Sequence, residues 1–294
     1  MEISNGINVL SLFDGMSCGQ IALERLGIKV DNYFASEIDK YAIKVTQANY
    51  PNTKQVGNVL GVKGIDLPKI DLLYGGSPCQ GFSFAGKQLN FEDDRSKLFF
   101  EFVRLIKECE PKYFLLENVK MKKEHEKVIT EHLGVEPILI NSSLLTAHNR
   151  PRLYWTNIPN IKQPNNKGML LKDIIDLQVN NYEYIPEAKT INRQYKKNYL
   201  QYDINGKGHG SQDQRAYYLD NKHGCLDTGA SGKAKILEQD GRIRKVTRNE
   251  AERLQGVPDN YTNIVNKSQA LKMLGNGWTV DVIAHIFLNS ISQN

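Results

Sequence analysis

Hydrophobic and polar positions in the first half of the chain alternate between two periods. Short apolar runs, typical of buried strands, occur at residues 7–13, 32–39, 70–76 and 112–119. Amphipathic stretches, typical of helices, lie between these runs and end at glycine or proline, at residues 20–27, 40–51 and 96–111. Two further strands are predicted within residues 134–145 and 152–158. Strands that alternate with helices predict an α/β fold with a doubly wound, mostly parallel sheet.

The pattern changes after Pro159. From residue 161 to about residue 241 the chain is rich in Asn, Lys, Gly, Gln and Tyr, and its periodicity is weak. Residues 204–233 hold many turn formers and little apolar sequence, which indicates a smaller, loop-rich second domain. A helical pattern returns at residues 268–291 and is expected to pack back on the first domain. We therefore expect a first domain at residues 1–160, a second at 161–263 and a C-terminal segment at 264–294.

The composition narrows the function classes without selecting one. The 294 residues carry a formal net charge of +5, which permits a nucleic-acid partner but does not require one. The four cysteines are widely spaced and form no CxxC pair, so neither a metal site nor a disulfide framework is predicted. No run reaches the roughly 18 apolar residues of a membrane span, and no secretion signal opens the chain. We expect a cytoplasmic protein with no metal and no membrane partner.

Polar residues follow the predicted strands, at the edge where ligands bind in parallel sheets. The segment FDGMSCG (residues 13–19) joins the first strand to the first helix. Its backbone N–H groups can cradle a polar ligand, although glycines at such a junction are equally typical of close packing. Glu37 ends the second strand and can accept hydrogen bonds from a ribose diol, but a solvated loop carboxylate fits the sequence equally well.

One cysteine stands apart from the other three. Cys79 lies in the segment GGSPCQGFSFAGK after the third strand, where flanking glycine and proline keep it off any regular element. A thiolate in such a loop can act as a nucleophile. The fourth strand ends in Glu117, and Arg150 and Arg152 begin the strand after the next loop. A nucleophile, a proton donor or acceptor and a cation at one sheet edge suit covalent attack on an electron-poor ring.

Six motifs in order give the chain a specific resemblance, which covers nearly all of it. The chain resembles the cytosine-5 DNA methyltransferases, as a compact bacterial or phage type with echoes of the mammalian de novo enzymes. The segments similar to that family's motifs are LSLFDGMSCGQIALERLG, GGSPCQGFS, ENV, NRPRLYW, RKVTRNEAERLQGVPDNYT and LGNGWTVDVI. The resemblance implies the sheet of the S-adenosylmethionine-dependent methyltransferases. It also makes residues 1–160 the catalytic and cofactor-binding domain and residues 161–263 the target-recognition domain.

The resemblance further implies a covalent mechanism on a cytosine that is flipped out of the DNA duplex. Cys79 would add to C6 of the ring, and Glu117 would protonate or hydrogen-bond N3. Arg152, together with Arg150, would hold the base carbonyl and a phosphate while favouring the thiolate. S-adenosyl-L-methionine would be the cofactor and S-adenosyl-L-homocysteine the product.

The residues implied in cofactor binding come from the strand ends and from the last motif. They are Phe13, Asp14, Gly15, Gly19, Glu37, Ile38, Asn58, Val59, Pro78, Leu98, Asn276 and Trp278. Four positions depart from the family's usual residues, namely Ser11, Asn58, His148 and Val257. None of these departures removes a reacting group, and the oxygen of Asn58 can still accept a hydrogen bond from an adenine amino group.

Two sets of residues are implied as DNA contacts. In the loop that follows the catalytic cysteine they are Gln80, Ser83, Lys87 and Arg95. In the second domain they are Gln212, Gln214, Arg215 and Lys233, each of which, taken singly, is better explained by a phosphate or solvent contact than by base reading. The prediction is a monomeric DNA (cytosine-5)-methyltransferase of the restriction–modification type, acting on double-stranded DNA. The alternatives are a transfer-RNA cytosine-5 methyltransferase and a catalytically silent DNA-binding relative.

Overall fold

The structure is a computed structural model that describes residues 6–77, 94–177, 179, 181–187, 190–204, 214–226 and 234–291. The chain divides into two compact units. Unit 1 comprises Met1–Ile140, Pro151–Gln163 and Val282–Asn294, and unit 2 comprises Asn141–Arg150 and Pro164–Asp281. This division differs from the expected boundaries in three places: residues 141–150 and 264–281 belong to unit 2, and residues 161–163 belong to unit 1.

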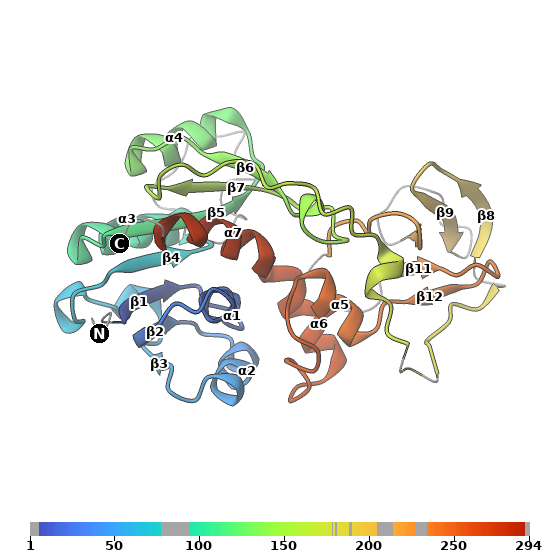
Figure 1. Ribbon diagram of the computed structural model, residues 1–294, viewed down its shortest axis with the longest axis horizontal. Coiled ribbons are helices and arrows are strands. Elements are labelled where there is room, and N and C mark those ends of the chain that lie inside the picture. The colour runs from blue at the N-terminus through green and yellow to red at the C-terminus, as the bar shows by residue number, and fades with distance from the viewer. Residues whose placement is uncertain are drawn as a thin grey trace. The chain divides into compact units, whose positions relative to one another are not determined.

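Unit 1 is built on a sheet that, within the described residues, has seven strands in the order β3-β2-β1-β4-β5-β7-β6 (Figure 1). The strands are β1 (Ile7–Leu12), β2 (Val30–Ser36), β3 (Lys54–Gln55), β4 (Leu72–Gly75), β5 (Tyr113–Val119), β6 (Ile138–Asn141) and β7 (Pro151–Thr156). The pairs β1·β2, β2·β3, β1·β4 and β4·β5 are parallel, and the pair β5·β7 is antiparallel. The predicted doubly wound, mostly parallel sheet is confirmed.

Helices cover both faces of this sheet. They are α1 (Cys18–Arg25), α2 (Lys40–Asn49), α3 (Asp94–Cys109), α4 (Lys123–Leu133) and α7 (Val280–Ile291). One core cluster joins Leu73 of β4 to Phe102 of α3 and Ile129 of α4. The next strand residue, Tyr74, packs its ring against Phe287 of α7, with 5.5 Å between the ring centroids. Because successive strand residues point to opposite faces, α3 and α4 cover one face of the sheet and α7 covers the other.

Unit 2 contains a second sheet, which in the described part of the chain has five strands in the order β12-β11-β10-β9-β8 (Figure 1). The strands are β8 (Thr190–Tyr195), β9 (Tyr199–Ile204), β10 (Arg215–Tyr218), β11 (Lys235–Leu237) and β12 (Ile243–Lys245). Among the strand pairs of this second sheet that the described residues form, β10·β11 is parallel and the other three are antiparallel. The sequence predicts a loop-rich domain here, because strands of three to six residues with many Tyr, Gln, Lys and Arg give little periodic signal.

The structure adds one helix to the prediction and divides the predicted C-terminal helical pattern in two. Helix α4 was not expected, because its sequence KEHEKVITEHL is dominated by charged and polar residues. The helical pattern predicted at residues 268–291 corresponds to two helices, α6 (Lys267–Asn276) and α7. Gly277, in an extended conformation, ends α6. All of α6 lies within unit 2.

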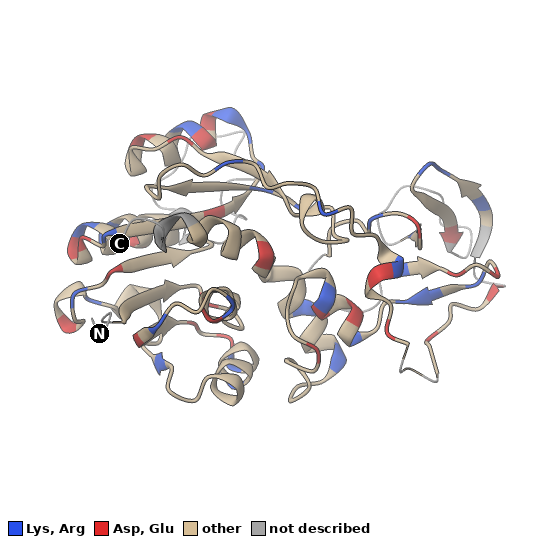
Figure 2. Cartoon of the chain, viewed as in Figure 1, with Lys and Arg blue, Asp and Glu red and all other residues tan. Residues whose placement is uncertain are grey.

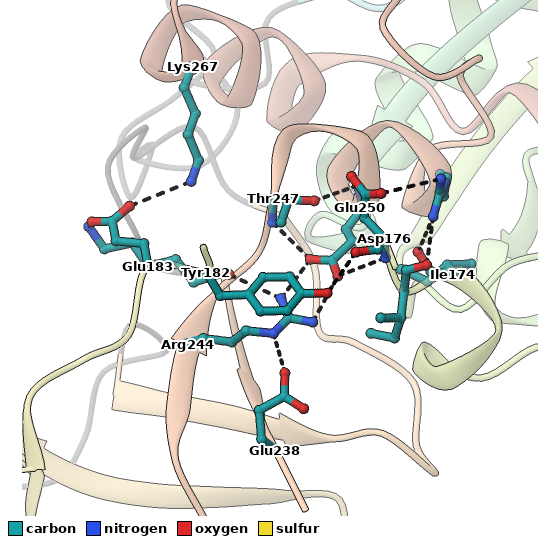
Figure 3. Close-up of polar contacts among 12 residues, drawn as sticks. Ile174, Asp176, Tyr182, Glu183, Glu238, Arg244, Thr247, Glu250 and Lys267 are labelled. Atoms are coloured by element: carbon teal, nitrogen blue, oxygen red, sulfur yellow. Dashed lines mark hydrogen bonds and ion pairs between the residues drawn. The ribbon is translucent and has the colours of Figure 1, made fainter. Parts of the chain in front are cut away.

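A fully buried arginine organises unit 2 (Figure 3). Arg244 on β12 donates from its two terminal nitrogens to the two carboxylate oxygens of Glu250, at 2.8 Å each. Its Nε donates to Glu238, and its guanidinium carbon lies 4.1 Å from the centroid of the Tyr182 ring. Arg244 and Glu250 are both 0% exposed, so each charge depends on the other and on nearby hydrogen bonds for its stabilisation.

The Glu250 carboxylate also fixes the start of helix α5 (Arg248–Leu254). It accepts a hydrogen bond from the N–H of Thr247 at 2.8 Å, while the N–H of Glu250 donates to the Thr247 hydroxyl at 3.1 Å. This reciprocal pair is a capping box. The same carboxylate accepts from the N–H of Asp176 at 3.2 Å. One buried carboxylate therefore joins β12, α5 and the segment around Asp176.

Replacing Arg244 by methionine is expected to destabilise the protein strongly, because Glu250 is left buried without its cation. Breaking a buried pair in this way costs about 3–5 kcal/mol of unfolding free energy. Arg242→Met is the matched control, since that arginine also lies over a tyrosine, Tyr184, but its ion pair with Asp240 is exposed. The control should change stability little. Urea unfolding of all three proteins measures the effect, and equal losses in the two variants would contradict the central role of Arg244.

Candidate active site

The ends of five strands meet at one edge of the unit 1 sheet. Strands β1, β2, β4 and β5 are parallel, so the loops that follow them leave from the same edge. Strand β7 runs antiparallel to β5, so its first residues lie at that edge instead of its last ones. The edge therefore brings together the loop after β1, Glu37, Ser77, Glu117 and Arg152.

Glu37 fastens the loop after β2 to the loop after β1. Its Oε2 accepts a hydrogen bond from the N–H of Gly15 at 2.7 Å. Its Oε1 accepts from the N–H groups of Ile38 and Asp39, at 2.7 and 2.8 Å. A carboxylate has about four acceptor positions, so these three bonds leave room for a ligand hydroxyl. The geometry agrees with a ribose acceptor whose position is fixed by the backbone around it.

Asp14 does not point outward as a ligand-binding carboxylate would. It accepts hydrogen bonds from the hydroxyls of Ser11 and Tyr33, both at 2.6 Å, and from the hydroxyl of Ser17. Burial raises the pKa of Asp14 to about 6, although these three hydroxyls oppose the shift. Its carboxylate therefore holds the loop between β1 and α1 together from inside.

Some glycine and apolar residues of the predicted cofactor site are packed into the core of unit 1, and one is exposed. Gly19 is explained by packing, because a methyl group there would collide with the hydroxyl of Tyr74. Phe13 and Leu98 are partly buried against the unit 1 core, and Val59 is buried in it. In contrast, the side chain of Ile38 is 74% exposed beside Glu37, and a large apolar group in that place is available to a ligand.

The remaining predicted cofactor residues lie apart in the sequence. The Asn58 side chain accepts a hydrogen bond from the N–H of Leu60 at 3.1 Å and so caps a short 3₁₀ helix, Val59–Gly61. Asn276 is the exposed last residue of α6, and Trp278 is partly buried in the stretch before α7. These last two residues belong to unit 2.

Two of the three charged catalytic candidates, Glu117 and Arg152, form an ion pair across strands β5 and β7. The Nε of Arg152 lies 3.0 Å from Oε1 of Glu117, and the two side chains are only 13% and 11% exposed. In the register of this antiparallel pair, Val119 faces Arg152 and Glu117 faces Tyr154, so the charged residues are diagonal neighbours on one face. The predicted proximity of glutamate and arginine is what the geometry shows.

Asn118 holds the segment that leads to the predicted nucleophile. Its Nδ2 donates to the carbonyl oxygen and the hydroxyl of Ser77, at 3.2 and 3.3 Å, and both residues are buried. Its Oδ1 accepts from the N–H of Val119 at 2.8 Å. Ser77 lies two residues before Cys79. Sequence reasoning assigned no role to Asn118, and only the close approach of β4 and β5 reveals one.

Arg150 has a different environment from Arg152. It belongs to unit 2, where its side chain is buried. Its Nη2 donates to the carbonyl oxygen of Gly277 at 2.9 Å, and its Nη1 donates to that of Leu226 at 3.4 Å and to the sulfur of Cys225 at 3.3 Å. Arg150 therefore links the segment 141–150 to two distant segments of unit 2.

Several predicted residues lie outside the described part of the chain. They are Pro78, Cys79, Gln80, Ser83, Lys87, Gln212 and Lys233. Among the other predicted DNA contacts, Arg95 is the second residue of α3, Gln214 is buried, and Arg215 opens β10.

Three further kinds of feature are relevant to the described residues: a helix face of one charge sign, a metal site and a membrane span. Figure 2 shows acidic and basic residues mixed along α4. In this helix the Lys123 side chain pairs with Glu126 at 2.5 Å and Lys127 with Glu131 at 3.7 Å. That helix therefore presents no surface of one sign. No group of three or more His, Cys, Asp or Glu side chains in the described ranges is placed to hold a metal ion. No described helix is long and apolar enough to cross a membrane.

Comparison with known proteins assigns the chain to one family. The family model for the C-5 cytosine-specific DNA methylase matches residues 7–292, and the chain belongs to this family. The Type II methyltransferase M1.ScrFI of Lactococcus lactis subsp. cremoris is 33% identical, over 94% of this chain and 75% of the relative. The Type II methyltransferase M.NlaX of Neisseria lactamica is 32% identical, over 95% of this chain and 94% of the relative.

A solved structure shares the fold. The Entamoeba histolytica methyltransferase EhMeth has a TM-score of 0.78 at 20% sequence identity, and the match covers 98% of this chain and 99% of that one. The predicted membership of the cytosine-5 DNA methyltransferases is confirmed by the family model and the curated relatives together.

Replacing Asn118 by alanine is expected to lower kcat for methyl transfer by up to about a hundredfold, the typical cost of misplacing a reacting group by about 1 Å. The variant frees Ser77 and with it the approach to Cys79. Asn157→Ala is the control, because Asn157 bonds the backbone of Phe114 and Lys112 at the other end of β5. Methylation with labelled cofactor measures kcat, and a control that loses as much activity would contradict the proposed anchoring.

Proposed function

We propose that the chain transfers a methyl group from S-adenosyl-L-methionine to C5 of a cytosine in double-stranded DNA. The observation that carries this proposal is the largely buried ion pair of Glu117 and Arg152 at the sheet edge where the Cys79 segment begins. The type II methyltransferases to which the chain is similar support DNA as the substrate. They also support a modification enzyme of a restriction–modification system. We further propose that it works as a monomer in the cytoplasm.

The loop after β1 fits a cofactor that carries an amino acid, a ribose and an adenine. Gly15 has a φ of 61° and open space where a side chain would be, so a ligand can approach its backbone. Glu37 offers acceptor positions for the ribose hydroxyls, and the exposed Ile38 offers apolar surface to the adenine. The Asn58 oxygen can accept from the adenine amino group. When bound, S-adenosylmethionine supplies an electrophilic methyl group.

Residues of unit 1 then make the cytosine reactive. The Cys79 thiolate adds to C6 and forms the carbon–sulfur bond, which moves electron density to C5 and N3. Glu117 holds a proton at N3, and Arg152 places a positive charge beside Glu117 and the base carbonyl. C5 can now accept a methyl group. Loss of the C5 proton to a base breaks the bond to Cys79 and restores the aromatic ring.

The target base must leave the stack for this chemistry, because neither C6 nor N3 is accessible inside a duplex. Unstacking and unpairing cost a few kcal/mol. Gln80, Ser83, Lys87 and Arg95 are the residues predicted to contact the DNA around the flipped base. Their roles and those of Pro78, Asn276 and Trp278 at the cofactor remain predictions.

The substrate class can be tested directly with labelled S-adenosylmethionine and two nucleic acids. Incubation with plasmid DNA should introduce label, and bisulfite sequencing should show protected cytosines within one short sequence. Incubation with transfer RNA should introduce none. Label that enters only RNA would favour the RNA enzyme, and absence of label in both would favour a silent DNA-binding relative.

Replacing Cys79 by serine should lower turnover by more than about a thousandfold, as loss of a catalytic nucleophile does. A serine hydroxyl is a poor nucleophile without an adjacent base, while a thiol is partly ionised at neutral pH. Cys109→Ser is the control, because burial raises the pKa of the Cys109 thiol and keeps it un-ionised. Duplex DNA that contains 5-fluorocytosine should trap the wild-type and the control proteins in a denaturation-resistant adduct. Turnover by Cys79→Ser would disprove the covalent step.

We infer that Arg215, on β10 of unit 2, contacts base edges and so helps to determine which DNA sequence is methylated. It faces Gln201 across the β9·β10 pair, and its Nε donates to the Gln201 side-chain oxygen at 3.4 Å. The guanidinium carbon lies 4.8 Å from the centroid of the Tyr199 ring. The neighbouring positions Leu200 and Ala216 belong to the core on the opposite face. A guanidinium supported in this way loses little freedom when its terminal nitrogens pair with a guanine edge.

Arg215→Ala is expected to change which sequences are methylated, with about 1–3 kcal/mol less discrimination at one base pair. Arg242→Ala is the control, because Arg242 also lies over a tyrosine but is paired with Asp240. Methylation of a library of randomised duplexes at two salt concentrations measures both variants. A uniform loss with a shallower salt dependence would assign Arg215 to a phosphate, and an unchanged profile would remove it from the interface.

A further inference from the structure

A buried chain of hydroxyl groups runs beneath the loop between β1 and α1. Tyr74 on β4 and Tyr33 on β2 lie on the two sides of β1, and their hydroxyl oxygens are 2.6 Å apart. The Tyr33 hydroxyl donates to Oδ1 of Asp14 at 2.6 Å. Because that hydrogen is used, the Tyr74 hydroxyl must donate to the oxygen of Tyr33. The chain of hydrogen bonds therefore runs from Tyr74 through Tyr33 to Asp14.

Both tyrosines are donors that water does not reach. Tyr33 is 4% exposed and Tyr74 is 1% exposed. Burial, together with the charge of Asp14, raises the pKa of each tyrosine hydroxyl, so both remain protonated. The ring of Tyr74 is fixed by Phe287 of α7, and its hydroxyl lies against Gly19 of α1. The chain of hydroxyls is thus anchored in the core at its far end.

At its near end the chain holds an unfavourable backbone in place. Phe13 and Ser17 have φ values of 56° and 63°, in the left-handed region that residues with a side chain rarely adopt. These two residues flank the stretch that contains Asp14. The Asp14 carboxylate also accepts from Ser11 at the end of β1 and from Ser17 at the start of α1, so it ties the two ends of the loop together.

We propose that Tyr33 and Tyr74 are positioning residues for the cofactor, which act through Asp14 to hold the β1–α1 loop in its ligand-binding conformation. This inference rests on the proposed function, because the ligand is S-adenosylmethionine. A loop already ordered in the free protein loses little entropy on binding, so the hydrogen bonds below it contribute to affinity without touching the ligand. Neither tyrosine was among the residues that the sequence indicated.

Calorimetry with S-adenosylhomocysteine tests the proposal. Tyr33→Phe removes one hydrogen bond to a charged group and should weaken binding about tenfold. Tyr74→Phe should weaken it less, because Asp14 keeps its direct donor. Tyr50→Phe is the matched control, since the Tyr50 hydroxyl donates to the Glu24 carboxylate at 2.6 Å in the same unit but outside this loop. Its affinity should equal that of the wild type. Steady-state kinetics should show the Tyr33→Phe effect in KM for the cofactor and not in kcat.

The pH dependence gives a second readout. The groups that face Asp14 are Ser11, Ser17 and Tyr33, with Tyr74 behind Tyr33 and the charge of Glu37 nearby. Since the pKa of Asp14 is raised to about 6, the carboxylate is ionised above that pH and protonated below it. A protonated carboxyl is a weaker acceptor for the three hydroxyls, and its own hydrogen needs an acceptor among groups that already donate to it. Wild-type affinity should therefore fall as the pH drops through about 6, and the affinity of Asp14→Asn should not change over that range.

Hydrogen exchange without ligand separates this proposal from the proposed function. The amide hydrogens of residues 14–17 should exchange faster in Tyr33→Phe than in the wild type and the Tyr50→Phe control. Unchanged exchange and unchanged affinity in a folded Tyr33→Phe protein would overturn the positioning role. Faster exchange in this loop, combined with a wild-type protein that binds no S-adenosylhomocysteine, would instead count against the proposed cofactor.

Discussion

The buried guanidinium of Arg244 determines how unit 2 is assembled. A fully buried charge is tolerated only where its donors are matched by acceptors, and here Glu250 and Glu238 supply them from α5 and from the end of β11. Since Glu250 also caps α5 and bonds the backbone of Asp176, one ion pair connects the sheet to the rest of the unit. Arg244 lies on β12, the three-residue strand at the edge of the described sheet, so the ion pair joins this short strand to α5.

The loop between β1 and α1 in unit 1 has the opposite electrostatic arrangement, because the enclosed charges there are the carboxylates of Glu37 and Asp14. Glu37 is surrounded by backbone N–H groups and Asp14 by hydroxyls, and neither has a cation among these partners. Neutral donors keep the carboxylates in place and leave their charge uncompensated. A loop built in this way is fixed before a ligand arrives, and it retains negative potential and acceptor positions for ligand hydroxyls.

The strongest periodic signals predicted the structure best. The buried strands of unit 1 and the helices between them follow from apolar runs and amphipathic stretches. The same strand pattern predicted Glu117 and Arg152 at one edge of the sheet, where they form an ion pair. The sheet of unit 2 and helix α4 were missed, because short strands and a helix rich in charge lack a clear period. The link from Tyr74 to Asp14 was not predictable either, since it joins residues 60 positions apart by way of Tyr33. The two tyrosines lie on strands that are separated by β1.

Strand β7, which runs antiparallel to its neighbour β5, brings the two charged residues of the site together. In a purely parallel sheet, a strand that begins with arginine would place it at the edge opposite the glutamate. Because β7 runs in the other direction, Arg152 at its start lies beside Glu117 near the end of β5. The next residue, Asn118, points to the other face and bonds Ser77 at the end of β4. The end of β5 therefore carries Glu117 of the charged pair on one face and, on the other face, Asn118, which holds Ser77 two residues before Cys79. A small shift of β5 would disturb both contacts together.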